Sequence, residues 1–454
     1  MSNALGIDLG SGKVAVVLTD EQGVTIDAVS MMLPQKNYDE IVMEIDPKDI
    51  FDTLDFAIKN LNDVARREVD CIGVCGQMHG VVLWNDLKLD HCNLITWQDK
   101  RADEDNFIYE LRKKTGLSNI YGGYGIVSLA WMKERNPNLL NEFDYAGTIM
   151  DYLVSKCCDK VEPIMDYTNA AGWGFFDNER LDWDMTAFEK TGLSKKILPK
   201  LTAMGTFIGE LCPQMADEWG IRKSAKVAVA CGDSQATILS SKQPWHNSIF
   251  INVGTGSQLT VVVDKSRLDG MEKELGMDVR PFVNDKFLVV VTAVCGGKSF
   301  QWLVETVETW LEQLGIDAPS KDSIYKTINR LGENCEERQL PKFLPYFREE
   351  RHVPGEYGSI SGIRWNNMSL ASVAKAMAFG MIESLWNRMP AQLTKKREKL
   401  VATGNGIKRS SLLRKVVKEI TEMELILSDS IEDAANGAAA MALQLQQRQQ
   451  KDTT

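Results

Sequence analysis

Two glycine-rich turns in the chain have residues suited to binding phosphate. Asp-Leu-Gly-Ser-Gly at residues 8–12 returns as Asn-Val-Gly-Thr-Gly at residues 252–256, and apolar stretches flank each turn on both sides. Glycines let the backbone approach a ligand closely, and successive amide N–H groups form a nest for an anion. Two ordinary hairpins are the alternative, but a matched pair favours phosphate. The predicted phosphate contacts are Gly10, Ser11, Gly12 and Lys13 in the first copy and Gly254, Thr255, Gly256 and Ser257 in the second.

Asp233 lies where the apolar run VAVAC ends and the helix-like segment SQATILS is about to begin. In α/β folds, ligands bind at the carboxyl ends of strands. A carboxylate at such a point could accept the proton of a hydroxyl group and could anchor a hydrated metal ion. The alternative is that Asp233 only caps the following helix, a role worth roughly 1 kcal/mol. The local sequence leaves both interpretations open.

Two short segments carry side chains suited to a polyol. CGQMHG at residues 75–80 offers an amide, a thioether and an imidazole between glycines. TWQDKR at residues 96–101 combines an indole with polar and charged groups. A structural histidine and a solvated salt bridge are the respective alternatives. The predicted substrate contacts are Gln77, Met78, His79, Trp97, Gln98, Asp99 and Arg101, with Gln77, His79 and Asp99 expected to contact the substrate directly.

Of two further glycine motifs, one is expected to be an ordinary turn and the other to contact an adenine ring. GGKS at residues 296–299 does not complete a phosphate-binding P-loop, because Thr292 stands where that pattern needs another glycine. Its lysine is therefore expected in an ordinary turn between a strand and a helix. VATGNG at residues 401–406 is expected to run from a strand into a turn that could form a wall against an adenine ring. The residues predicted to form this wall are Gly404, Asn405 and Gly406.

The composition argues against several classes of function. The 454 residues carry 52 Lys and Arg against 63 Asp and Glu, so the net charge of −11 provides no basic field for nucleic acid. The longest apolar runs are too short to cross a bilayer, and we expect no secretory leader because a strand is expected to begin by Leu5. Nine scattered cysteines without CxxC pairs disfavour zinc and indicate a reduced, cytoplasmic protein.

Strands and helices alternate along the chain, which predicts an α/β fold. The duplicated hairpin indicates two related domains, and the turn-rich segment SSKQPWHNS at residues 240–248 places their boundary near residue 244. The periodicity of apolar residues predicts helices over residues 46–69, 147–155 and 369–389 and in DSIEDAANGAAAMALQLQQ near the C-terminus, and it predicts strand, turn and helix over residues 227–240 and 399–420.

In this order, the motifs resemble those of the carbohydrate kinases of the FGGY family, within the actin and sugar-kinase ATPase superfamily. The resemblance runs from about residue 4 to residue 445. Residues 8–12 and 252–257 are similar to the two phosphate motifs, residues 401–406 to the adenosine motif, and CGDSQA to the block that holds the catalytic aspartate. The resemblance implies two actin-like (ribonuclease H-like) α/β domains with a nucleotide cleft between them.

The same resemblance implies a kinase that uses ATP and Mg²⁺. By this likeness Asp233 is the catalytic residue, and Asp8 matches the aspartate that holds Mg²⁺ through water, so Asp8 and Asp233 are the predicted metal ligands. Residues 1–244 would carry the sugar site, the first phosphate hairpin and Asp233, and residues 245–454 would carry the second hairpin and the adenosine site. The expected partner is a small-molecule sugar, without nucleic acid or membrane.

The block GQMHG together with W-x-D-x-R is similar to the ketose kinases of the family rather than to its glycerol kinases. Phosphorylation of a terminal hydroxyl of a ketose is therefore the implied reaction. A kinase of the five-carbon ketoses xylulose or ribulose, a switching ATPase of the superfamily and a sugar sensor without phosphotransfer are the alternatives. A seven-carbon ketose is favoured as substrate by likeness in four blocks, TWQD at 96–99, AGTIMDY at 146–152, NAAGWGFF at 169–176 and EERH at 349–352.

Overall fold

The structure is a computed structural model that describes residues 2–34, 41–85, 91–254, 256–268, 277–347, 350, 353 and 355–452, without the side chain of residue 452. The predicted phosphate contact Thr255 and three residues of the EERH block lie outside these ranges. The chain forms two compact units. Unit 1 comprises Met1–Lys242, Arg280–Asp285 and Ser430–Thr454, and unit 2 comprises Gln243–Val279 and Lys286–Asp429.

The elements of unit 1 alternate as predicted. Its strands are β1 (Asn3–Leu9), β2 (Lys13–Thr19), β3 (Thr25–Met32), β4 (Glu44–Ile45), β5 (Val69–Gly76), β6 (Val82–Trp84), β7 (Leu94–Ile95), β8 (Tyr145–Gly147), β9 (Ile164–Asp166), β10 (Phe176–Asp177), β11 (Asp182–Trp183), β12 (Lys200–Thr202), β13 (Phe207–Glu210), β14 (Lys226–Ala228) and β15 (Cys231–Gly232). Its helices are α1 (Pro47–Lys59), α2 (Asp63–Arg66), α3 (Phe107–Thr115), α4 (Gly125–Arg135), α5 (Pro137–Asn141), α6 (Ile149–Cys157), α7 (Tyr167–Trp173), α8 (Met185–Glu189), α9 (Pro213–Trp219), α10 (Asp233–Ser240) and α17 (Asp433–Asp452).

Unit 2 has a similar mixture of elements. Its strands are β16 (Ser248–Val253), β17 (Ser257–Asp264), β18 (Met277–Pro281, whose last two residues belong to unit 1), β19 (Lys286–Ala293), β20 (Lys342–Leu344), β21 (Ser359–Ser361), β22 (Lys399–Thr403) and β23 (Glu424–Leu427). Its helices are α11 (Lys298–Gln313), α12 (Lys321–Glu333), α13 (Leu370–Trp386), α14 (Ala391–Thr394), α15 (Asn405–Arg409) and α16 (Ser411–Thr421). Within the described residues of both units, no helix has the length and apolarity needed to span a membrane.

The main sheet of unit 1 runs in the order β13-β14-β5-β1-β2-β3, and β15 also pairs with β5. β1 and β2 form the predicted antiparallel hairpin, whereas β5 runs parallel to both β1 and β15. Side chains alternate between the two faces of a strand. Leu5, Ile7 and Val16 therefore share one face, where they belong to a buried core with residues of α1, α6 and α9.

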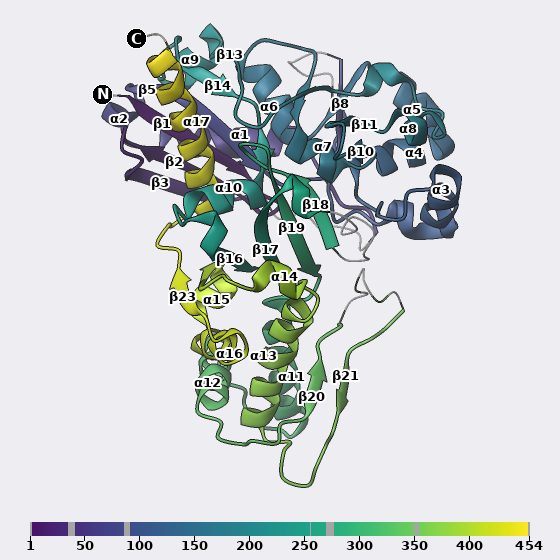
Figure 1. The fold of residues 1–454 in the computed structure, drawn as a ribbon, viewed down its shortest axis with the longest axis vertical. Coiled ribbons are helices and arrows are strands. Elements are labelled where there is room, and N and C mark those ends of the chain that lie inside the picture. Colours follow the sequence, from purple (N-terminus) through teal and green to yellow (C-terminus); the bar gives the residue numbers. More distant parts are fainter. Residues whose placement is uncertain are drawn as a thin grey trace. The chain divides into compact units, whose positions relative to one another are not determined.

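The opposite face of this sheet is covered by α17 (Figure 1). The helix approaches closely because it is rich in small residues, and Ala435 packs in a small core of its own on this face. A Cβ atom added to Gly6 of β1 would lie 1.9 Å from the carbonyl oxygen of Ala435, and one added to Gly437 would lie 1.7 Å from the carbonyl oxygen of Ala236 in α10. Glycine is thus required at both contacts.

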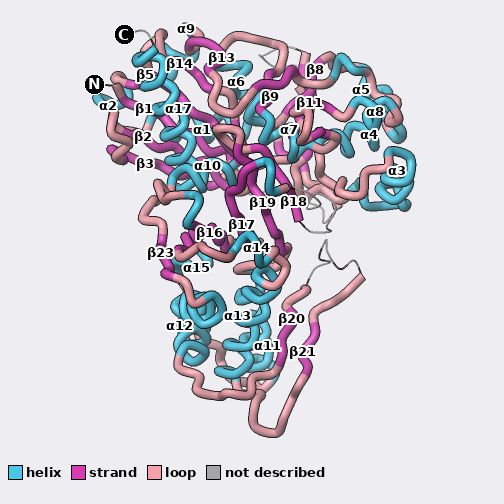
Figure 2. Tube along the Cα trace, viewed as in Figure 1, coloured by secondary structure: helices cyan, strands magenta, loops and turns pink. Residues whose placement is uncertain are grey.

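The sheet of unit 2 has the order β18-β19-β17-β16-β22-β23. The β16–β17 hairpin is antiparallel and β22 runs parallel to β16, the same arrangement that β1, β2 and β5 have in unit 1. The predicted repetition of a supersecondary unit is therefore confirmed. Helices α11, α12, α13 and α16 lie together, and α13 packs against β17 and β19 (Figure 2).

Two details differ from the sequence-based expectations. The helix predicted over residues 46–69 does begin after Asp46, whose carboxylate accepts the N–H of Lys48, but it ends at Lys59. The prediction of its end was wrong because Asn62 caps the N-terminus of a separate short helix, α2. In addition, α17 packs with unit 1 although the sequence assigns it to the second domain, since its small residues fit the sheet of unit 1.

Candidate active site

Three parallel strands of unit 1 end side by side, and predicted site residues lie at their ends. The register sets Asp8 of β1 opposite Cys75 of β5, and Cys75 opposite Cys231 of β15. Gln77 and Asp233 each follow two residues after these cysteines. Because the carboxyl ends of parallel strands form one edge of a sheet, Asp8, Gln77 and Asp233 gather at that edge.

The carboxylates of Asp8 and Asp233 influence each other. Burial, and then the negative charge of Asp233, raises the pKa of Asp8 to about 7, although the ammonium group of Lys13 acts in the opposite direction. Among the described residues, no N–H or O–H donor reaches the buried Oδ1 atom of Asp8. Two neighbouring carboxylates with an unsatisfied oxygen fit a hydrated divalent cation such as Mg²⁺, which takes oxygen ligands and retains several waters.

Asp233 is not the N-cap residue of α10. Gly232 is the N-cap residue, and Asp233 is the first residue of the helix. Its Oδ1 atom accepts the N–H of Ser234 at 2.6 Å. Burial raises the pKa of Asp233, while the bond from Ser234 and the positive charge of Arg280 lower it. Asp233 therefore contacts the first turn of α10 without being its N-cap residue. A buried carboxylate opposed by a nearby cation is typical of functional sites.

The predicted substrate residues Gln77 and His79 are held in a tightly packed segment. Gln77 is 2% exposed and donates from Nε2 to the carbonyl oxygen of Gly10 at 3.4 Å, and no described donor reaches its buried Oε1 atom. His79 has a φ of 80° and stacks on Tyr124 with ring centroids 4.6 Å apart. A left-handed conformation at a residue other than glycine costs energy and is common at binding sites.

Arg280 is a member of this site that the sequence did not indicate. It is 4% exposed, donates to Oγ of Ser234 at 3.4 Å and contacts Sδ of Met78 at 3.6 Å. Arg280 thus provides a buried positive charge beside Asp233. A single arginine in a strand, 202 residues away from Met78 in the chain, carries no motif that sequence reasoning could detect.

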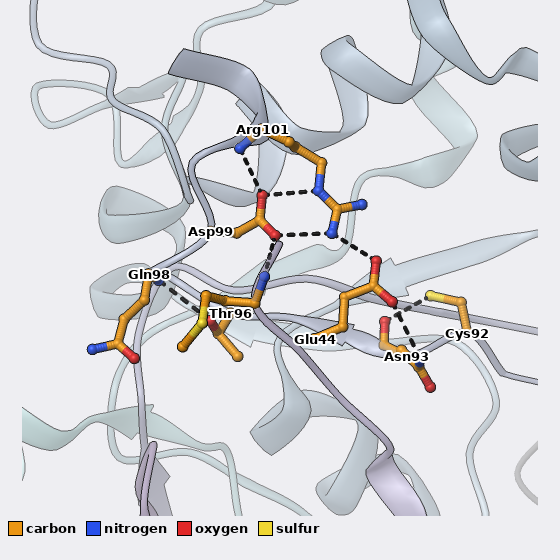
Figure 3. A network of polar contacts seen from close by, with 8 residues as sticks. Glu44, Cys92, Asn93, Thr96, Gln98, Asp99 and Arg101 are labelled. Carbon is orange, nitrogen blue, oxygen red and sulfur yellow. Dashed lines mark hydrogen bonds and ion pairs between the residues drawn. The ribbon is translucent and has the colours of Figure 1, made fainter. Parts of the chain in front are cut away.

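Asp99 and Arg101 form an ion pair that is buried rather than solvated. Asp99 is 3% exposed and accepts hydrogen bonds from Nε and Nη2 of Arg101, at 2.8 Å each (Figure 3). The backbone N–H of Met43 donates to the same carboxylate at 2.8 Å, and Arg101 also pairs with Glu44. The side chain of Gln98 extends away from this pair (Figure 3). The pair therefore fixes the loop on which Trp97 and Gln98 lie.

Trp97 connects two of the predicted sites within unit 1. Its indole Nε1 donates to Oγ of Ser11 at 2.8 Å, although the two residues are 86 positions apart in the chain. On the same turn as Ser11, Lys13 forms an ion pair with Glu432. The first glycine turn is thus bonded to the predicted substrate segment on one side and to the loop before α17 on the other.

In unit 2, the predicted adenosine segment lies beside the second glycine turn. A Cβ atom added to Gly404 would lie 2.3 Å from Oδ1 of Asn252, and one added to Gly406 would lie 2.6 Å from the carbonyl oxygen of Val253. These approaches are possible only for glycine, and Gly404 has a φ of 84°. Asn405 begins α15 at this point. The two predicted nucleotide segments of unit 2 are therefore neighbours.

The GGKS segment also packs on the second glycine turn. As predicted, Lys298 lies where a strand passes into a helix, because Gly297 is the N-cap residue of α11. The N–H of Gly297 donates to the carbonyl oxygen of Gly254 at 2.8 Å, and Oγ of Ser257 donates to that of Cys295 at 3.1 Å. The sequence did not predict the contact between GGKS and the second glycine turn. Once the P-loop pattern was excluded, no motif indicated which segment GGKS would pack against.

Known proteins with similar sequences and folds are carbohydrate kinases. The chain is 26% identical to a sedoheptulokinase from Mus musculus, with 97% of each chain covered. It is 24% identical to a gluconokinase from Bacillus subtilis (strain 168), with 97% of this chain and 87% of that protein covered. The structure of a ligand-bound xylulose kinase from Lactobacillus acidophilus superposes with a TM-score of 0.84 at 21% identity, over 99% of this chain and 90% of that one.

These likenesses confirm the predicted α/β fold with two actin-like domains. In addition, the family model described as "FGGY family of carbohydrate kinases, N-terminal domain" matches residues 3–240. That match contains the β1–β2 hairpin, the substrate segments and Asp233. Because it spans more than half of the sequence, the chain belongs to the FGGY family of carbohydrate kinases.

Proposed function

We propose that this protein transfers the γ-phosphate of ATP to a terminal hydroxyl of a ketose, and that it converts sedoheptulose to sedoheptulose 7-phosphate. The observation that carries the proposal is the meeting of Asp8, Gln77 and Asp233 at one edge of the unit 1 sheet. This edge combines a base, a metal ligand and a polar acceptor. Family membership supports a sugar kinase, and likeness to the mouse sedoheptulokinase over 97% of both chains supports the seven-carbon sugar.

Asp233 acts as the general base in this proposal. The oxygen of the sugar hydroxyl forms a bond to the γ-phosphorus of ATP, and the bond from that phosphorus to the bridging oxygen breaks. The hydroxyl proton passes to the carboxylate of Asp233, and ADP leaves. The charge of Arg280 and the N–H of Ser234 oppose the effect of burial on the pKa of Asp233, which favours the ionised form that can accept a proton.

Asp8 and Asp233 would hold Mg²⁺ through water. When bound, the ion supplies positive charge that balances the negative charge on the transferring phosphoryl group. The buried Oδ1 atom of Asp8, which meets no N–H or O–H donor among the described residues, is suited to a water of the metal shell. A cation at this position would also relieve the repulsion that raises the pKa of Asp8.

The glycine turns of each unit are proposed to bind phosphate through backbone N–H groups. In unit 1 the turn is Gly10–Gly12, and Ser11 adds a hydroxyl donor that is already oriented by Trp97. In unit 2 the turn around Gly254 lies beside residues 404–406, which we propose as the wall against the adenine ring. The proximity of these two segments within unit 2 supports a common nucleotide.

The sugar contacts are proposed to come from the segment at the end of β5 and from the loop after β7. The Oε1 atom of Gln77 meets no donor among the described residues, so a sugar hydroxyl is a suitable partner for it. His79 and Met78 continue the same surface, and Trp97 and Gln98 belong to the second segment. Asp99 is better explained as a positioning residue, because four N–H groups of Arg101 and Met43 already donate to its carboxylate.

Loss of the bond between Trp97 and Ser11 is expected to weaken ATP binding. Ser11→Ala removes a donor to phosphate, which is worth about 1.5–3 kcal/mol for a bond to a charged group. Trp97→Phe keeps an aromatic ring but removes the indole donor, which should cost about 0.5–1.5 kcal/mol. The double variant should lose less than the sum, since both changes break one shared bond. Calorimetric titration of ATP into the four proteins measures this coupling.

Trp302→Phe is the matched control, because Trp302 lies in unit 2 and is 37% exposed, close to the 36% of Trp97. It is expected to leave the ATP affinity unchanged. Strictly additive losses in the Trp97 and Ser11 variants would show that the bond does not contribute to nucleotide binding.

The sugar assignment is tested with a coupled assay for ADP across a panel of acceptors. A site that hydrogen-bonds sugar hydroxyls rejects analogues that leave its polar groups unpaired. We therefore expect the highest kcat/KM for sedoheptulose, lower values for xylulose, ribulose and gluconate, and negligible turnover of glycerol. Gluconate belongs in the panel because the chain is 24% identical to a gluconokinase.

The outcomes of this panel separate the alternatives. The highest kcat/KM for xylulose would overturn the seven-carbon assignment and leave the kinase proposal standing. Steady ATP hydrolysis without phosphorylation of any sugar would contradict the kinase proposal and favour a switching ATPase. Sugar binding without ATP turnover would instead favour a sensor.

A further inference from the structure

Helix α7 (Tyr167–Trp173) contacts the substrate segment at the end of β5 through two hydrogen bonds. The carbonyl oxygen of Gly172 is bonded to Nδ1 of His79. The indole Nε1 of Trp173 donates to the carbonyl oxygen of Gly80 at 2.9 Å. These bonds enclose His79, whose left-handed backbone conformation needs such support. One end of α7 therefore fixes the predicted sugar-binding segment.

The other end of α7 contacts the segment that leads into Asp233. The N–H of Gly232, the residue directly before Asp233, donates to Oγ1 of Thr168 at 3.0 Å. Nδ2 of Asn169 donates to the carbonyl oxygen of Ala230 at 3.1 Å. The side chains of α7 thus bond to the residues on both sides of Cys231, directly before Asp233.

The side chain of Thr168 is itself fixed by a hydrogen bond to a buried carboxylate. Its hydroxyl donates to Asp166, with distances of 2.7 Å and 2.9 Å to the two carboxylate oxygens. Asp166 is the N-cap residue of α7 and also accepts the N–H of Asn169 at 2.9 Å. Asp166, Thr168 and Asn169 are all 0% exposed. A hydroxyl that donates to a carboxylate and accepts from Gly232 has little freedom to rotate.

We propose that Thr168 is a positioning residue for the phosphoryl transfer. Through α7, it holds Asp233 at a fixed distance from the sugar-binding segment at the end of β5. The inference rests on the proposed function. Catalytic groups must be held within about 0.5 Å of the productive geometry, and a displacement of about 1 Å can cost 100-fold in rate. Thr168 is hydrogen-bonded to the backbone N–H of Gly232, directly before Asp233. At its other end, α7 is hydrogen-bonded to His79 through the carbonyl oxygen of Gly172.

The test compares Thr168→Val with Thr168→Ser. Valine has nearly the shape of threonine but makes neither bond of the hydroxyl, so kcat for the best sugar should fall about 10- to 100-fold. Serine keeps both bonds and should retain kcat within about threefold of the wild type. The affinity for ATP, measured by calorimetry in the absence of sugar, should stay unchanged in both variants. Thr168→Ala, which lacks the branched side chain altogether, should repeat the loss of kcat.

Thr115→Val is the matched control for loss of a buried hydroxyl. Oγ1 of Thr115 donates to the carbonyl oxygen of Leu111 at 2.7 Å and accepts the N–H of Leu117 at 3.3 Å, and the residue is 6% exposed. This variant should show a similar loss of melting temperature to Thr168→Val but a wild-type kcat. Equal values of kcat in the Thr168→Val and Thr115→Val variants would overturn the positioning role alone. A wild-type protein that phosphorylates no sugar would overturn the proposed function and this inference together.

Discussion

Replacement of Asp233 with asparagine is expected to lower the rate of sugar phosphorylation by about 10²–10⁴, the usual contribution of a general base. The amide has the shape of the carboxylate but does not accept the hydroxyl proton. Its oxygen can keep the bond from the N–H of Ser234, so the fold and the affinity for ATP should persist. A coupled assay for ADP measures the rate, and calorimetry measures ATP binding.

Asp151→Asn is the control for this prediction. Asp151 is 1% exposed, and its carboxylate accepts the N–H of Thr148 at the start of α6. Asp151→Asn therefore makes the same chemical change at a buried carboxylate that supports a helix end and lies outside the proposed active site. Its turnover should remain near that of the wild type. If Asp233→Asn kept wild-type turnover, or if both variants lost the same fraction, the assignment of the base would be wrong.

Replacement of Gly437 with alanine is expected to destabilise the protein by about 1–3 kcal/mol, the cost of overpacking a core. In an exposed helix the same change is stabilising by about 1 kcal/mol, so the sign of the effect is informative. The new Cβ atom would lie 1.7 Å from the carbonyl oxygen of Ala236, and α10 and α17 would have to move apart. Because α10 begins at Asp233, turnover should fall as well. Urea denaturation followed by circular dichroism measures the loss.

Gln444→Ala serves as the control in the same helix. Gln444 is exposed, so its replacement should change the free energy of unfolding by less than about 0.5 kcal/mol. A Gly437→Ala variant as stable as the wild type would show that α17 can shift without cost, and the close packing against α10 would then not restrain Asp233.

Much of the local structure was predictable because its determinants are close together in the chain. The β1–β2 and β16–β17 hairpins follow from apolar strands around a glycine turn, and the structure confirms both. The position of Asp233 at the end of a strand follows from a change of hydrophobic period within a few residues. The end of α1 was not predictable in the same way, because the continued helical periodicity after Lys59 hides the new cap at Asn62.

The fold class and the segments proposed to bind ATP and sugar were predictable from the chain alone, since both depend on motifs of a few residues each. Which of these residues meet depends on packing in three dimensions. Arg280 reaches Met78 because β18 ends in unit 1, and α17 joins unit 1 because Gly6 and Gly437 permit its close approach. Such contacts depend on packing between segments far apart in the chain, where no local pattern specifies the partner.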